Sequence, residues 1–150
     1  MATTLHDLDF AAWAEEQAEQ LRRLGLDHPE IAAKLDLSNL AEEVADMGKS
    51  IGREFVSRLA VLLAHLAKWR WQPGLRGRSW TLTIRSQRHE LSALLEDNPS
   101  LRPQLSELLR KAWKRGREQA AIETGLSLTV FPDTCPFALD QVLSQDWLPD

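Results

Sequence analysis

Apolar residues recur at helical spacing from Leu37 to Trp71. The mean interval between them is about 3.6 residues, which is the period of an α-helix and not that of a strand. A straight helix of this length would be on the order of 50 Å long. We therefore predict one long central helix on which the other segments pack. Its apolar stripe consists of Leu40, Val44, Met47, Ile51, Phe55, Leu59, Leu62, Leu66 and Trp69.

Gly48 and Gly52 lie four residues apart on one side of this helix. The missing side chains allow another backbone to approach closely. A kink or a break near Gly48 is the alternative, because each glycine costs up to ~1 kcal/mol of helix propensity relative to alanine. Since the apolar period passes through both glycines without a phase slip, we expect one helix with local bending.

Capping residues and helix breakers divide the rest of the chain into three further long helices and a tail. After Leu126 the tail is extended and rich in proline, and it ends in a short helix near 137–144 that should pack over the bundle. The predicted fold is an all-α antiparallel bundle of four main helices with this C-terminal extension, in a single domain over residues 1–150. The expected caps and stops are Asp7 or Asp9 and Gly25 for the first helix, Pro29 for a short turn, Asp36 for the central helix, Ser79 and Asn98–Pro99 for the third, and Ser100 and Gly125 for the fourth.

The net charge of −4 hides a strong asymmetry along the chain. Residues 1–54 carry 12 acidic and 5 basic side chains, and residues 55–89 carry 7 basic and no acidic ones. Residues 90–150 carry 10 acidic and 6 basic ones. The basic segment can attract an anionic partner, or it can pair with the acidic segments of the same fold; we favour the second interpretation.

Composition limits the possible classes of protein further. Cys135 is the single cysteine, so an internal disulfide or a cysteine zinc site is excluded, and we expect it to cap or pack. The first ten residues lack the basic flank and apolar run of a secretory signal, and no apolar stretch approaches the ~20 residues that span a bilayer. We therefore expect a soluble cytoplasmic protein without membrane contact.

A row of polar side chains follows one margin of the central helix's apolar stripe. The short loop after this helix should make the third helix return antiparallel, so that paired residue numbers add up to about 150. His65 should then face Arg85. The candidate polar pocket consists of Glu54, Arg58, His65, Gln72, Gln87 and Arg88.

This cluster has two interpretations. It can bind a small anion or polar ligand, with Arg58 and Arg88 as donors and His65 titrating near neutrality. It can instead be a structural hydrogen-bond network in which Glu54 neutralises Arg58 one turn away. We favour the structural interpretation, because polar rows of this kind often fix helix register.

Other chemistry has weaker support in the sequence. Glu42, Glu43 and Asp46 have suitable spacing for a metal, but no histidine motif accompanies them, and carboxylates near a helix N-terminus need no metal. Serine elbows, phosphate loops and dinucleotide motifs do not occur. We therefore expect no metal and no cofactor.

The segment KWRWQPGLRGRSW interleaves tryptophans with basic residues, a combination that holds single-stranded nucleic acid. Trp69 and Trp80 fall on predicted apolar stripes, however, which leaves Trp71 as the only free ring. The acidic net charge also opposes phosphate binding. The candidate anion-binding residues are Arg70, Arg76, Arg78, Arg85 and Arg88.

Several sequence blocks together resemble one known family. The order seen in the bacterial family called domain of unknown function 29 is matched by LAEEVADMGKS, RLAVLLAHLAKWRWQP, RSWTLTIRSQRHEL, LLEDNPSLRP, IETGL and FPDTCPFALDQVL. The resemblance extends from Asp9 to Leu148, and only the segment LDHPEIAAKLD departs from the usual pattern. It implies a compact, all-helical bacterial protein with no established activity and no agreed catalytic residues.

We predict a non-enzymatic interaction module that forms a homo-oligomer or binds a protein partner. The two helix glycines and the six tryptophans, more than one small core needs, motivate this prediction. The alternatives are binding of nucleic acid or a phosphorylated ligand through the basic segment, and an enzyme that uses His65 with Arg58 and Glu54.

Overall fold

The computed structural model describes residues 2–150, and none of these residues forms a β-strand. The predicted all-α fold, with four long helices and a short final helix, is confirmed. The α-helices are α1 (Leu5–Leu8), α2 (Phe10–Asp27), α3 (Pro29–Ala32), α4 (Leu37–Trp71), α5 (Arg78–Asp97), α6 (Leu105–Thr124) and α7 (Leu139–Leu143). The connections contain the 3-10 helices η1 (Pro73–Leu75), η2 (Pro99–Gln104) and η3 (Leu128–Val130).

Most predicted helix boundaries are confirmed. The long helix α4 passes through both glycines without a break. Asp36 caps α4 by accepting a hydrogen bond from the backbone N–H of Asn39 at 3.2 Å. Gly125 follows α6 with φ of 73°, a left-handed conformation that suits glycine.

Three predicted caps are wrong. Gly25 lies inside α2, because its backbone does not take the left-handed conformation that ends a helix and α2 continues to Asp27; a Cβ there would be in ordinary contact with Leu37 at 3.6 Å. Ser79 lies in the first turn of α5, which begins one residue earlier. Ser100 lies in η2, where its N–H and its hydroxyl both donate to Asp9, at 2.6 and 2.9 Å.

Contacts divide the chain into two compact units. The first unit extends to residue 53 and includes residues 95–102, and the second consists of residues 54–94 and 103–150. The single domain predicted over residues 1–150 stays a prediction.

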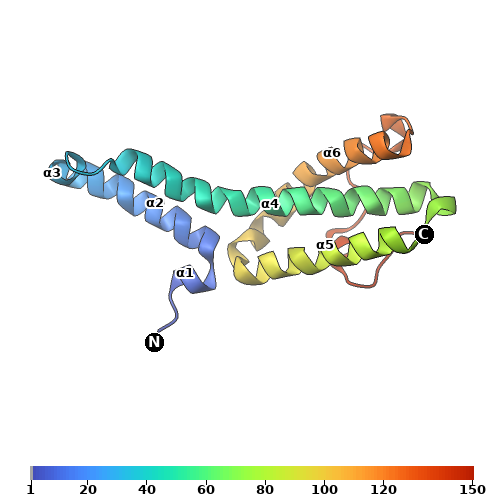
Figure 1. Cartoon of the computed structure of the whole chain (residues 1–150), viewed down its shortest axis with the longest axis horizontal. Coiled ribbons are helices and arrows are strands. Elements are labelled where there is room, and N and C mark those ends of the chain that lie inside the picture. The colour runs from blue at the N-terminus through green and yellow to red at the C-terminus, as the bar shows by residue number, and fades with distance from the viewer. Residues whose placement is uncertain (1) are drawn as a thin grey trace. The chain divides into compact units, whose positions relative to one another are not determined.

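In the first unit, α2 lies antiparallel to the first part of α4 (Figure 1). The helices meet closely at Gly48, where a Cβ would lie 3.0 Å from Ala14 Cβ and 3.2 Å from the carbonyl oxygen of Ala11. The predicted close approach at Gly48 is therefore confirmed, whereas Gly52 has no such neighbour within 4 Å. The buried apolar side chains of this unit are Ala14, Ala18, Leu37, Ala41, Leu95 and Leu101.

In the second unit, α5 lies antiparallel to the second part of α4 (Figure 1). The helix α6 runs parallel to this part of α4. On α6, Gly116 lies against the backbone of α4, where a Cβ would be 2.8 Å from the carbonyl oxygen of Ala60. The largest of its fully buried side chains are those of Trp113, Phe55, Phe131, Leu59, Leu62, Leu63, Leu66, Leu91 and Val142.

The tail packs on the second unit, as the sequence predicts. Trp113 Nε1 donates to the carbonyl oxygen of Pro132 at 2.9 Å, and Arg117 Nε donates to that of Phe131 at 2.9 Å. Arg117 also forms an ion pair with Asp133 at 3.0 Å. Side chains of α6 thus hold the extended backbone before α7.

Candidate functional site

Arg58 is the centre of one part of the predicted polar row. Its Nε donates to Glu54 Oε1 at 3.1 Å, and its Nη1 donates to Gln87 Oε1 at 3.5 Å. Glu90 lies 4.0 Å from its Nη2. The guanidinium therefore has carboxylate and amide partners on both helices, although Arg58 and Glu54 keep about a third and nearly half of their side-chain surface exposed.

His65 has different neighbours. Its Nδ1 lies 2.8 Å from the carbonyl oxygen of Val61, one turn earlier on α4. Burial lowers the pKa of His65, and the Lys68 ammonium lowers it further, while the hydrogen bond to Val61 and the Glu123 carboxylate oppose this shift. Lys68 is 8% exposed and forms a 3.1 Å ion pair with Glu123. His65 therefore lies beside an ion pair between α4 and α6, and burial is the main cause of its lowered pKa.

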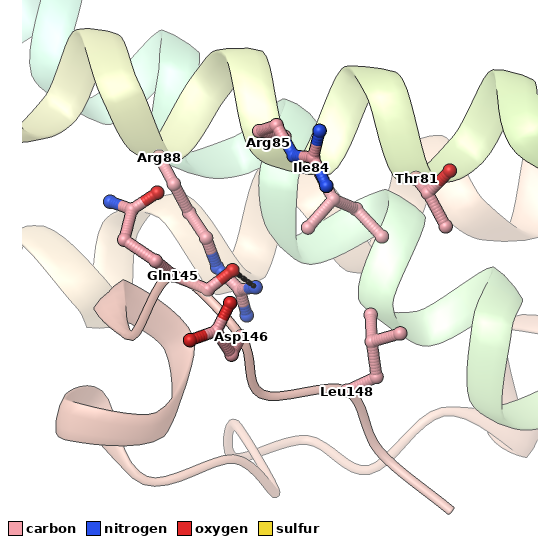
Figure 2. A pocket seen from close by; sticks show the side chains of 7 residues that line it. All are labelled: Thr81, Ile84, Arg85, Arg88, Gln145, Asp146 and Leu148. Carbon is pink, nitrogen blue, oxygen red and sulfur yellow. Dashed lines mark hydrogen bonds between the residues drawn. The ribbon is translucent and has the colours of Figure 1, made fainter.

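Arg88 is 2% exposed and extends from α5 to the tail (Figure 2). Its Nε donates to the carbonyl oxygen of Val142 at 2.8 Å, and its Nη2 donates to those of Trp147 at 2.7 Å and Gln141 at 3.4 Å. Its Nη1 donates to the carbonyl oxygen of Gln145 at 3.4 Å. Gln141 and Val142 lie in α7, whereas Gln145 and Trp147 follow it, so the planar guanidinium joins the end of α7 to the last residues of the tail.

This placement corrects the expectation that Arg88 shares a polar pocket with His65. Arg58 contacts Glu54 and Gln87, whereas His65 lies beside the Lys68 pair. Gln72 follows α4 and its N–H donates to the carbonyl oxygen of Lys68 at 2.8 Å. Arg58 and His65 both lie on α4, but the partners nearby differ: Arg58 binds α5, the Lys68 ammonium beside His65 pairs with α6, and Arg88 of α5 binds the tail.

A small cavity of about 130 Å³ opens between α5 and the tail. Arg85 and Asp146, which have opposite charges, both line it, and the Arg88 guanidinium is already occupied by carbonyls (Figure 2). The cavity therefore selects neither an anion nor a cation. Its lining residues are Thr81, Ile84, Arg85, Arg88, Gln145, Asp146 and Leu148.

The basic loop does not present free rings. Trp71 packs edge-on against Phe131, with centroids 5.2 Å apart, which corrects the prediction that its ring is free. The Arg70 guanidinium lies over Trp71 at 4.9 Å, and Arg76 lies over Trp69 at 5.1 Å. The tryptophan rings that could stack on bases therefore already contact other side chains of the protein.

Arg76 and the remaining candidate anion-binding arginines are also dispersed. Arg76 Nε donates to the carbonyl oxygen of Trp69 at 2.7 Å. Arg78 and Arg85 are exposed on α5, and Arg88 is buried. The five arginines therefore do not converge on one point.

The first unit has an asymmetric surface. Residues on the contact line between α2 and α4, which are buried or lie against the other helix, are Ala14, Ala18, Gly25, Ala41 and Gly48. Residues that directly follow them are Glu15, Glu19, Leu26, Glu42 and Lys49. Residues that directly precede them are Trp13, Gln17, Leu24, Leu40 and Met47. In an antiparallel pair, equivalent offsets from the contact line point to the same side of both helices.

One side of this helical hairpin is therefore charged and the other is apolar. We call the second side the apolar hairpin face; it consists of Trp13, Leu21, Leu24, Leu40, Val44, Met47 and Ile51. Leu40 and Met47 are 44% and 48% exposed, although the sequence pattern predicts that they are buried. They are exposed because α2 covers only the neighbouring line of α4.

Comparison with known proteins agrees with this fold. The sequence profile described as Domain of unknown function DUF29 matches residues 5–148. The chain belongs to this family. The crystal structure of an α-helical protein of unknown function from Rhodospirillum rubrum is similar to the structure of this chain. The two sequences are 24% identical, and the TM-score is 0.73 over 98% of this chain and 93% of that one. No curated protein matches the sequence.

Neither a metal-binding cluster nor a membrane-spanning helix occurs within residues 2–150 of this DUF29 chain. Within residues 2–150, no group of three or more His, Cys, Asp or Glu side chains is arranged to hold a metal ion. No helix in that range combines the length and the apolar character needed to cross a membrane. Cys135 is half-buried, its thiol donates to the carbonyl oxygen of Phe137 at 3.6 Å, and burial raises its pKa. This thiol is poorly suited to nucleophilic chemistry.

Proposed function

We propose that this DUF29 chain is a non-enzymatic interaction module of the bacterial cytoplasm that binds protein through the apolar hairpin face. The observation that carries the proposal is the exposure of Leu40 and Met47 beside the half-buried Trp13, Leu24 and Val44. Contiguous apolar surface on paired amphipathic helices is the feature by which such helices bind partners.

The small core of the first unit supports the same proposal. Ala14, Ala18 and Ala41 contribute little apolar area at the contact between α2 and α4. Two helices joined in this way are marginally stable in water, because packing of an apolar face supplies most of a helix's stability. Covering the apolar hairpin face with a partner would add the missing buried area.

The alternative functions have less support. An enzyme that uses His65 needs an imidazole that exchanges protons near neutrality, but its pKa is lowered by burial and its Nδ1 is bound to Val61. A single-strand binder needs accessible rings, but Trp69 and Trp71 lie under arginine side chains.

The test compares wild-type protein with two surface variants in sedimentation velocity and in affinity capture from the source cells. Leu40→Lys combined with Met47→Lys places two charges on the apolar hairpin face, and we expect it to abolish association. Leu26→Lys is the matched control, because Leu26 is 81% exposed on the charged side of the same hairpin. The proposal is wrong if the double variant associates as the wild-type chain does, or if the wild-type chain neither associates nor captures a partner.

A further inference from the structure

We infer that the occupant of the apolar hairpin face is the exposed basic side of α5 in a second copy of this chain. The inference rests on the proposed function, since it names the partner of the same face. It depends on an acidic margin around that face and on a basic, partly apolar surface elsewhere on the same molecule.

The margin of the apolar hairpin face is acidic. Exposed carboxylates border it on both helices, while Arg23 beside them is already hydrogen-bonded to Glu19 at 3.2 Å. These carboxylates belong to Glu16, Asp27 and Glu43. Two such faces packed on each other would bring acidic margins together, and like charges at an interface cost affinity. A basic partner fits better than a second hairpin.

The basic side of α5 has the matching chemistry. Arg78, Leu82, Arg85 and His89 recur at i, i+4, i+7 and i+11, which places them on one side of the helix. All four are exposed, and Leu82 is 49% exposed. We call these four residues the basic α5 face. Leucine between two guanidinium groups can insert between Leu40 and Met47 while the arginines meet the acidic margin.

In this arrangement the acidic and basic segments of the chain would face each other across the contact between two copies. The residues up to 54 are strongly acidic and residues 55–89 are basic. Each copy carries one apolar hairpin face and one basic α5 face. In a dimer with a two-fold axis this contact would occur twice, whereas repetition of the contact by another rotation would give a closed ring or an open chain of copies.

The first experiment measures self-association by sedimentation velocity at 50 and 500 mM salt. We expect the wild-type chain to associate at micromolar concentration and to dissociate as salt screens the charge pairs. Arg78→Glu combined with Arg85→Glu should weaken association at least about tenfold, because both cations then repel the acidic margin. Circular dichroism and thermal unfolding check that each variant is folded; should one unfold, Glu16→Lys with Glu43→Lys tests the same contact from the other side.

The decisive experiment mixes the two double variants at a concentration at which each alone is expected to be monomeric. The Leu40→Lys, Met47→Lys chain keeps its basic α5 face, and the Arg78→Glu, Arg85→Glu chain keeps its apolar hairpin face. An equimolar mixture should therefore form a heterodimer with one intact contact. A mixture that stays monomeric overturns the inference.

Other outcomes separate this inference from the proposed function. If the Arg78→Glu, Arg85→Glu chain associates like wild type while the Leu40→Lys, Met47→Lys chain does not, hairpins pair with hairpins; the inference fails and the proposed function survives. A wild-type chain that stays monomeric but captures a cellular protein only with an intact apolar hairpin face has the same consequence. Unchanged association of both variants overturns both.

Discussion

The two halves of α4 have the same apolar period, but they pack differently. In the second unit, large side chains such as Phe55 and Leu66 are fully buried. In the first unit, α2 meets α4 through alanine and glycine, and Leu40 and Met47 stay about half exposed. The difference teaches that an apolar period identifies a helix, whereas the neighbours determine how wide a stripe becomes core.

The largest expected effect comes from the same substitution in each half of α4. Leu66→Ala should lower the free energy of unfolding by about 2–5 kcal/mol, since it leaves a cavity in a closely packed core. Leu40→Ala should cost less than about 1 kcal/mol in dilute, unassociated protein, because its side chain is already partly hydrated. Urea unfolding of both variants measures the difference. Equal losses would contradict the contrast between the two regions.

Arg88 tests how the second unit holds its tail. Arg88→Lys keeps the positive charge, but an ammonium cannot reach the four carbonyl oxygens that the guanidinium binds. We expect the free energy of unfolding to fall by about 1.5–3 kcal/mol and proteolytic cleavage within residues 139–150 to become faster. Arg85→Lys on the same helix is exposed and serves as the control, with an expected change below about 0.5 kcal/mol. A tail equally resistant in both variants would show that other contacts hold it.

Much of the fold follows from local sequence signals. The long helix, the Asp36 cap and the glycine stop at Gly125 depend on residues within a few positions of each other, and all three are confirmed. The family blocks also point to DUF29, which the match over residues 5–148 confirms. Local propensity and period are sufficient for these features.

The candidate site depends on long-range contacts that the sequence does not encode in a readable pattern. Arg88 donates to carbonyls more than fifty residues away, so its place in the predicted row could not reveal its partners. Asp9 was predictable as a cap but not as the acceptor for Ser100. Gly116 is a sequence signal for a long-range contact: it interrupts an otherwise good helix, and it marks the close approach to α4 at Ala60.

Three glycine-to-alanine substitutions rank the helix contacts on a finer scale. Gly116→Ala should destabilise by about 1–3 kcal/mol, because its Cβ would meet the Ala60 carbonyl oxygen at 2.8 Å. Gly48→Ala meets Ala14 at 3.0 Å, and this crowding should cancel its gain in helix propensity. Gly52→Ala has open space and should stabilise by about 0.5–1 kcal/mol. A different order in thermal unfolding would contradict the close contacts assigned to the first two glycines.

The smallest expected effect is a pH dependence that arises from His65 in the second unit. Burial lowers the pKa of His65 from its ordinary value of 6.5, so the unfolded chain binds this proton at a higher pH than the folded chain. The free energy of unfolding should therefore be constant with respect to this group above about pH 7.5 and should fall as the pH drops through 6.5 toward the folded pKa. His65→Gln should reduce that slope, measured by urea unfolding between pH 8 and 5.5. An unchanged slope in His65→Gln would mean that the imidazole is hydrated. The closer packing of the second unit, compared with the first, would then not extend to this margin of α4.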